Sequence, residues 1–71
     1  MLNPAVPAQI LYDTPDFEIV RPGSYVLCAV SGERIALDDL KYWSAAFQEA
    51  YRGAEEATAA FAAGGAKNLP K

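Results

Sequence analysis

Residues 26–44 carry the sequence VLCAVSGERIALDDLKYWS, and this stretch decides the predicted fold. It begins with an apolar run to Val30, which is typical of a buried strand. A Ser-Gly turn then leads into a short strand at residues 35–37, and two aspartates precede Leu40 as they do at the start of a helix. The order predicted is therefore strand, tight turn, edge strand and helix.

The residues before this stretch add further strands to the same sheet. Phe17 and Ile19 fall on one face of an extended segment, which is the period of a half-buried strand. Pro22 and Gly23 fit the two central positions of a type II turn, where the glycine accepts a positive φ. The candidate strands are residues 9–12, 17–20, 25–30 and 35–37. Together they predict an antiparallel meander.

One amphipathic helix is predicted to follow and to end at residue 61 or 62, before a Gly-Gly pair. Asp38 is placed to act as its N-cap, with Leu37 packed on Tyr42 in a hydrophobic staple. The large apolar side chains share one helical face, at positions 40, 43, 47, 51 and 61. We expect Trp43, on this face, to pack against the apolar strand that opens the stretch.

The predicted fold class is α+β: a small antiparallel meander of three to four strands, followed by one C-terminal amphipathic helix packed on the sheet. We expect a single domain at residues 9–62, with flexible tails at residues 1–8 and 63–71. A chain of this size buries only about 60% of its unfolded surface, and one cysteine without histidine supplies no disulfide or zinc site. Self-association or a partner protein would add stability.

The charge and hydropathy of the chain argue against several classes of protein. With a net charge of −3 and a pI near 4.6, it lacks the basic surface that binds nucleic-acid backbones. No run approaches the roughly 18 apolar residues of a membrane-spanning helix, and the N-terminus lacks the features of a secretory signal. One unpaired cysteine fits a reducing compartment. We therefore expect a cytoplasmic protein that contacts neither nucleic acid nor membrane.

Cys28 is the only soft nucleophile or soft metal ligand in the sequence. A catalytic thiol needs a neighbouring base, usually histidine, and the chain has none, so a small core residue is the favoured interpretation. Residues 28–32, CAVSG, also have the form of a zinc knuckle in which serine replaces the second cysteine. Structural zinc takes four ligands, so we expect no metal and no cofactor. Descent from a zinc ribbon stays open.

Paired acidic residues offer no catalytic site in this sequence. Capping explains Asp38 and Asp39, and no nucleophile elbow or phosphate loop is present, so we expect no catalytic residue and no enzyme. The outer face of the predicted helix is a candidate partner-contact patch, because a single aromatic on a locally flat face is typical of a modest contact surface. Its residues are Tyr42, Glu49, Arg52 and Gly53. The alternative is that Tyr42 lies over Leu37 and the face is only solvated.

Three segments carry a resemblance to a known family. They are residues 26–32, VLCAVSG; residues 35–44, IALDDLKYWS; and residues 48–51, QEAY. Together with FEIVRPG at residues 17–23, they resemble a family of short bacterial proteins catalogued as domain of unknown function 2093, over about residues 9–57. The resemblance implies a bacterial, cytosolic protein. It implies no activity, substrate, cofactor or site.

Two classes of function remain. The favoured hypothesis is a small, non-enzymatic protein-interaction module that binds a protein partner or associates weakly with itself. The alternative is a metal-free relic of a zinc-ribbon-like, nucleic-acid-associated domain. The net charge of −3 favours the first, because a nucleic-acid partner would be repelled.

Overall fold

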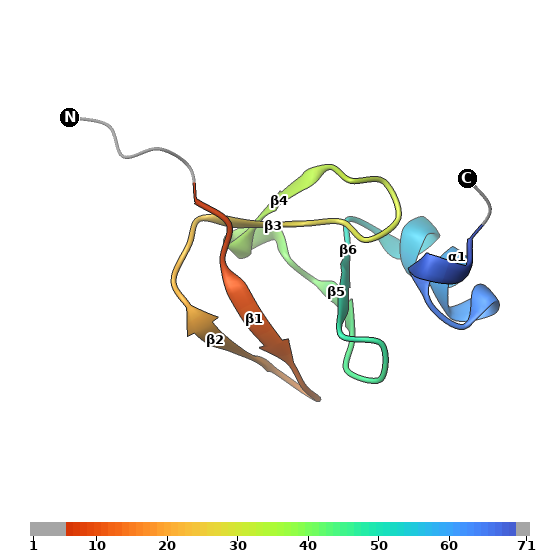
Figure 1. The fold of residues 1–71 in the computed structure, drawn as a ribbon, viewed down its shortest axis with the longest axis horizontal. Coiled ribbons are helices and arrows are strands. Elements are labelled where there is room, and N and C mark those ends of the chain that lie inside the picture. The colour runs from red at the N-terminus through yellow and green to blue at the C-terminus, as the bar shows by residue number, and fades with distance from the viewer. Residues whose placement is uncertain (1–5, 70–71) are drawn as a thin grey trace.

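The computed structural model describes residues 6–69 of the 71-residue chain (Figure 1). Six short strands precede one α-helix, and two 3-10 turns complete the regular structure of this part. The strands are β1 (Gln9–Tyr12), β2 (Phe17–Arg21), β3 (Tyr25–Leu27), β4 (Arg34–Ala36), β5 (Tyr42–Ser44) and β6 (Glu49–Tyr51). The helices are η1 (Leu37–Asp39), α1 (Ala54–Ala63) and η2 (Ala66–Asn68). None of these helices is long and apolar enough to cross a lipid bilayer.

The strands pair as three separate antiparallel hairpins. β1 pairs with β2, β3 with β4 and β5 with β6, and each pair is a two-stranded sheet of its own. In Figure 1 the β5–β6 hairpin stands between β1–β2 at one end of the molecule and α1 at the other. The predicted α+β class is confirmed, but the prediction of one continuous meander is wrong.

The edge of β3 explains why a single meander does not form. On the side away from β4, the N-terminal segment lies along this edge, where Pro7 and Tyr25 form a parallel bridge. The Ala8 amide donates to the Tyr25 carbonyl at 2.7 Å, and the Ser24 amide donates to the Val6 carbonyl at 2.8 Å. Because these bonds occupy the edge, β2 cannot continue the ladder there.

The two predicted turns around β3 have different outcomes. Gly32 has a φ of 78°, so the turn between β3 and β4 does use the conformational freedom of glycine. Gly23 is not among the glycines with positive φ, so the predicted type II turn is wrong. Glycine is required at position 23 for another reason: a Cβ there would collide with the backbone of Ala8, which passes close by. Glycine is needed at position 23 for close approach of two chain segments.

The long helix predicted from residue 38 is wrong over most of its length. Its first half is η1 followed by the β5–β6 hairpin, and only Ala54–Ala63 is α-helical. Asp38 therefore caps nothing: it lies inside η1, and the N-cap of α1 is Gly53, which has no side-chain cap bond. The predicted staple is also absent, since Leu37 packs on the core whereas Tyr42 is 42% exposed on β5.

The physical reason lies in the residues that interrupt the helical pattern. Tyr42, Trp43 and Tyr51 are aromatic and favour strands over helices. Gln48, at the end of the loop between β5 and β6, has a φ of 55°, which an α-helix does not allow. Gly53 then separates the hairpin from α1. The four-residue spacing of the aromatic residues at 43, 47 and 51 thus imitated one face of a helix.

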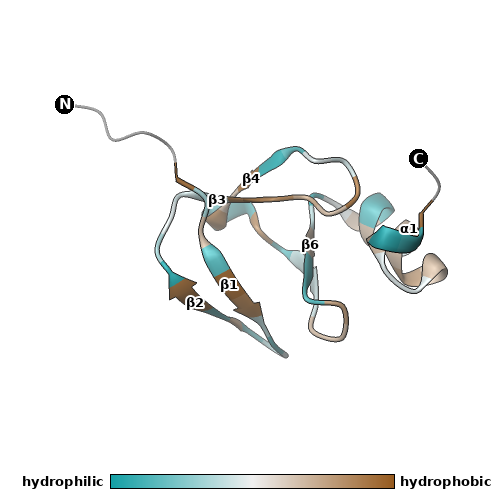
Figure 2. Ribbon diagram, in the orientation of Figure 1, coloured by the Kyte–Doolittle hydropathy of each residue, from teal (hydrophilic) through white to brown (hydrophobic). Residues whose placement is uncertain are grey.

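The core joins the hairpins through two adjoining clusters. The first consists of the buried residues Val26, Cys28, Ile35, Leu40 and Ala50, and the second of Tyr51, Ala57 and Ala60. Val30 packs against both clusters and makes them continuous. Trp43 packs on the first cluster as predicted, although it does so from β5 and not from a helix. Figure 2 shows the hydrophobic β3 running through the centre of this arrangement.

Two side chains of the β5–β6 hairpin hold the β1–β2 hairpin in place. The Trp43 Nε1–H donates to the Asp13 carbonyl at 2.7 Å, and its ring meets Phe17 edge to face at 5.1 Å between centroids. The Gln48 side-chain amide bonds both backbone groups of Tyr12: Nε2 donates to the carbonyl at 2.7 Å, and Oε1 accepts from the amide at 2.9 Å. The Gln48 side-chain amide thus links the β1–β2 and β5–β6 hairpins, which share no backbone ladder.

Residues on both sides of the predicted domain, residues 9–62, also make hydrogen bonds with it. Residues 6–8 lie along β3, and the C-terminal segment is bonded to β6. There the Glu49 carboxylate accepts from the Ala66 amide at 3.0 Å and from the Tyr51 hydroxyl at 2.7 Å. The remaining parts of the two predicted tails, residues 1–5 and 70–71, lie outside the described residues.

Candidate functional site

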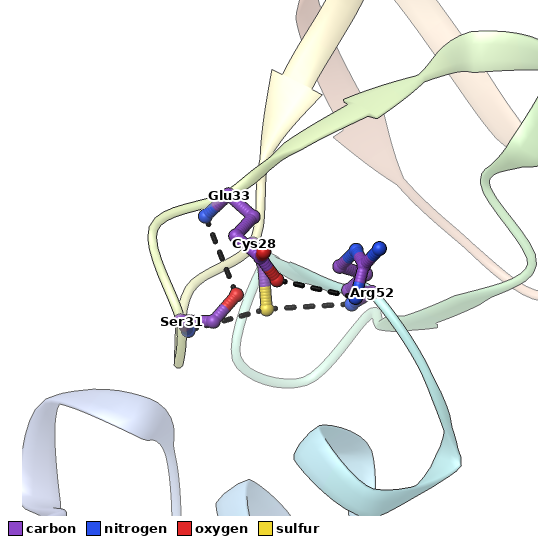
Figure 3. Close-up of polar contacts among 4 residues, drawn as sticks. All are labelled: Cys28, Ser31, Glu33 and Arg52. Atoms are coloured by element: carbon purple, nitrogen blue, oxygen red, sulfur yellow. Dashed lines mark hydrogen bonds and ion pairs between the residues drawn. The ribbon is translucent and has the colours of Figure 1, made fainter.

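The turn after β3 has the backbone form of a zinc knuckle. Cys28 Sγ accepts the amide of Ser31 at 3.4 Å, and the Cys28 carbonyl accepts the amide of Gly32 at 2.9 Å (Figure 3). The Ser31 hydroxyl, at the position of a second thiolate, accepts the amide of Glu33 at 3.3 Å. Hydrogen bonds within the turn therefore close it, and serine takes a structural part in them without a metal.

Cys28 also connects the turn to the distant β6–α1 junction. Its Sγ accepts the backbone amide of Arg52 at 3.3 Å, a bond between residues 24 apart in the chain. Burial raises the pKa of the thiol, but hydrogen bonds from Ser31, Arg52 and Val30 outweigh burial and hold the pKa below its ordinary value. With 2% of its surface exposed, the thiol lies in the core, as predicted.

Arg52 links this turn to a cleft on the surface. While its backbone amide is held by Cys28, its side chain extends outward, and Nη1 pairs with Glu33 Oε1 at 3.2 Å. Both side chains are more than half exposed, at 57% and 55%, so the pair adds little stability. What the backbone bond does fix is the position from which the guanidinium projects.

The cleft lies where β4, η1 and the β6–α1 junction meet. We call it the arginine cleft; it has a volume of about 300 Å³ and is lined by Arg34, Ile35, Ala36, Asp39, Arg52, Gly53 and Glu56. Two arginines and two acidic residues are thus among the residues that line this small depression. Gly53 opens the helix on its wall and contributes no side chain.

Arg34 is held in a defined position in this cleft. Its guanidinium carbon lies 4.5 Å from the centroid of the Tyr25 ring, which is a cation–π contact. Within residues 6–69, the ion pair recorded is that of Arg52 with Glu33, so Arg34 lies beside acidic groups without pairing with one. Stacking of this kind leaves the N–H groups at the guanidinium edge free to donate.

The structure separates the four residues of the predicted contact patch. Arg52 and Gly53 line the arginine cleft. Glu49 is occupied by Tyr51 and Ala66, so its part is structural, and Tyr42 lies on β5 opposite Tyr51. The patch as a single helix face is therefore wrong, because residues 42–52 are not helical.

Arg34, Asp39 and Glu56 are cleft residues that the patch did not include. In the sequence, these three residues stand out only as charged residues beside turns and helix caps. Exposure to solvent explains such charges equally well. The sequence assigns Asp39 to capping, and Glu56 enters no predicted site. Only the fold, which places β4, η1 and the start of α1 around one cleft, brings these charged residues together.

Two observations bear on metal binding and on the surroundings of the Cys28 thiol. No three histidine, cysteine, aspartate or glutamate side chains within residues 6–69 gather as metal ligands. The chain has no histidine to act as a base for Cys28, and its sulfur accepts hydrogen bonds from the backbone amides of Ser31 and Arg52. The arrangement is suited to binding through charge and hydrogen bonds.

Comparison with known proteins places the chain in a family. Residues 19–60 match the family described as uncharacterized protein conserved in bacteria (DUF2093), which is more than half of the 71 residues. The match spans all of the cleft residues and the knuckle-like turn. No curated protein and no solved structure matches the chain. The chain therefore belongs to the DUF2093 family of uncharacterized bacterial proteins.

Proposed function

We propose that this protein is a small, non-enzymatic protein-interaction module of the bacterial cytoplasm, and that the arginine cleft receives a segment of its partner. The observation that carries the proposal is Arg34, a guanidinium fixed on Tyr25 but not paired with a carboxylate in the described structure. Arginine positioned in advance is enriched at protein interfaces, since little side-chain entropy is lost on binding.

The distribution of charge supports the same site. The chain carries six basic residues and a net charge of −3, and two of those six line the cleft. The four charged side chains of the lining sum to zero (two arginines against two carboxylates), so this region is less negative than the molecule as a whole. A partner segment with acidic character would be repelled least here.

Site-specific cross-linking tests the proposal. Position 53 tolerates a side chain, because its φ is −156° and a Cβ would meet only the flexible Glu56 carboxylate at 3.2 Å. A p-benzoylphenylalanine placed there in cells is expected to cross-link one defined protein, identified by mass spectrometry, whereas the same probe at exposed Ala62 on α1 is not.

Two variants test whether the cross-link depends on the two arginines of the cleft. The Arg34→Gln/Arg52→Gln double variant should lose most of the product, and Arg21→Gln, an exposed arginine on β2 outside the cleft, should retain it. Equal yields from positions 53 and 62, or no loss in the double variant, would refute the cleft as the contact region.

A second candidate function has one observation in its favour. The amide of Ser31 donates to Cys28 Sγ and Gly32 has a positive φ, as in the knuckles of zinc ribbons, so a metal-free relic of a nucleic-acid-associated ribbon is the alternative. Fluorescence anisotropy with labelled single-stranded RNA and duplex DNA at low salt tests it. Micromolar binding that weakens steeply with salt would favour this alternative over the interaction module.

A further inference from the structure

We propose that the arginine cleft binds a carboxylate group of a partner peptide, with Arg34 and Arg52 as its ligands. This inference rests on the proposed function and specifies the chemistry of the partner. Arginine presents N–H donors in a planar fork that matches the two oxygens of a carboxylate. Arg34 and Arg52 both line the same depression of about 300 Å³.

Arg34 is the primary ligand in this arrangement. The face of its guanidinium is covered by the Tyr25 ring at 4.5 Å, so the rotation of the side chain is restricted before a ligand arrives. The donors at the edge of the group remain available, and Arg34 has no carboxylate within 4.0 Å in residues 6–69. A carboxylate placed there gains a charge-assisted hydrogen bond without breaking an ion pair.

Arg52 is the second ligand, and it has donors to spare. Nη1 is engaged by Glu33 at 3.2 Å, and the guanidinium carries further N–H groups beyond that contact. Its backbone is held by Cys28 Sγ at 3.3 Å, so the side chain projects from a fixed point at the edge of the cleft. The exposed pair with Glu33 is weak, and a second carboxylate can share the group.

The two acidic residues define which carboxylate can enter. Asp39 and Glu56 line the same cleft and would repel a free anion. They accept hydrogen bonds, however, and the backbone amides next to a peptide carboxylate are donors. The lining therefore favours a carboxylate carried on a peptide over an inorganic or small organic anion.

The size of the cleft sets the scale of the ligand. A volume near 300 Å³ is at the lower limit of sites for small molecules, so it admits about one residue and no folded element. The carboxylate can come from the C-terminus of a partner or from an Asp or Glu side chain in an extended segment. Short peptides distinguish these two sources.

The experiment is an NMR titration of the full chain, observing backbone amides and arginine Nε–H groups. Three peptides are compared: acetyl-Ala-Ala-Ala with a free carboxylate, acetyl-Ala-Glu-Ala amide, and acetyl-Ala-Ala-Ala amide. We expect saturable shifts at Arg34, Arg52 and Gly53 with one or both carboxylate peptides and not with the neutral one. Which of the two binds more tightly identifies the source. Arg34→Gln should weaken binding at least tenfold, whereas Arg21→Gln should leave it unchanged.

Three results would overturn the inference. They are equal shifts with the neutral peptide, unchanged affinity in Arg34→Gln, and equal binding of sodium acetate, which would show an adventitious anion only. The proposed function is tested separately by the cross-link from position 53. Suppose that the cross-link forms in the wild type and in Arg21→Gln but is lost in the double variant, while no carboxylate peptide binds. The interaction module then stands and the carboxylate inference fails.

Discussion

Gln48 offers the sharpest test of how the three hairpins are held together. Its side-chain amide makes three hydrogen bonds: two with the backbone of Tyr12, at 2.7 and 2.9 Å, and one from Nε2 to the Ala45 carbonyl at 2.7 Å. The residue adopts a φ of 55° to make them, a conformation that costs an ordinary side chain about 1 kcal/mol. The bonds and the strain can be separated by substitution.

Gln48→Ala removes the three bonds and keeps the strain. At about 1 kcal/mol each, the bonds sum to about 3 kcal/mol, and rehydration of the exposed backbone groups reduces the expected loss to about 2 kcal/mol. Gln48→Gly removes the same bonds but accepts the positive φ, so its loss should be about 1 kcal/mol smaller. For a domain of this size, 2 kcal/mol corresponds to a fall in Tm of about 8–16 °C.

Urea and thermal denaturation followed by circular dichroism measure these differences. Hydrogen exchange supplies an independent reading, because the Tyr12 amide donates to Gln48 Oε1 and should lose protection in both variants. If Gln48→Ala unfolds within 0.5 kcal/mol of the wild type and the Tyr12 amide stays protected, then the side chain does not join the hairpins. Equal stability of the alanine and glycine variants would show that the backbone at position 48 carries no strain.

Four further predictions concern the core, the turns and the solution conditions. Trp43→Ala should cost about 3–5 kcal/mol, since it removes core packing and the bond to the Asp13 carbonyl, and a near-native melting curve would contradict this. Gly23→Ala should destabilise the domain strongly because its Cβ meets the backbone of Ala8, and an unchanged Tm would show that the segment at residues 6–8 moves aside freely. Burial and then the Glu49 carboxylate raise the pKa of Tyr51, so stability should fall as the pH rises above about 10, where only the unfolded tyrosine ionises; Tyr51→Phe should reduce that slope in urea titrations. A chelator should leave the melting curve unchanged, whereas a shift would reveal a metal bound by the chain.

The strands up to β4 were predictable because their signals are local. β1 has the predicted bounds, and β2 exceeds its prediction by Arg21 alone. β3 ends at Leu27 and not at residue 30, and β4 begins and ends one residue before the predicted strand. Gly32 marks its turn because glycine adopts the positive φ that the turn requires. The apolar run from residue 25 leads directly to the core. Where the backbone preference and the burial pattern of a few neighbouring residues agree, the sequence is sufficient to predict the strand.

The β5–β6 hairpin was not predictable in the same way. Alanine and glutamine around the aromatic residues at positions 43, 47 and 51 favour a helix locally, and the spacing of four residues agrees with that preference. The outcome is decided by contacts from elsewhere in the chain: Asp13 accepts from Trp43, and Tyr12 bonds the side chain of Gln48. Tertiary bonds to the first hairpin thus override a local helical tendency, and the pairing of Tyr42-Trp43-Ser44 with Glu49-Ala50-Tyr51 becomes the stable alternative.

The arginine cleft also depends on a long-range contact, which is why only Arg52 and Gly53 of its lining were among the predicted residues. The knuckle-like turn could be recognised from its local sequence, but its use could not, because Cys28 Sγ accepts the amide of a residue 24 positions away. That bond fixes the start of α1 beside β4 and so brings Arg52 into the depression that Arg34 lines. A thiol that needs no metal therefore serves to position a charged side chain.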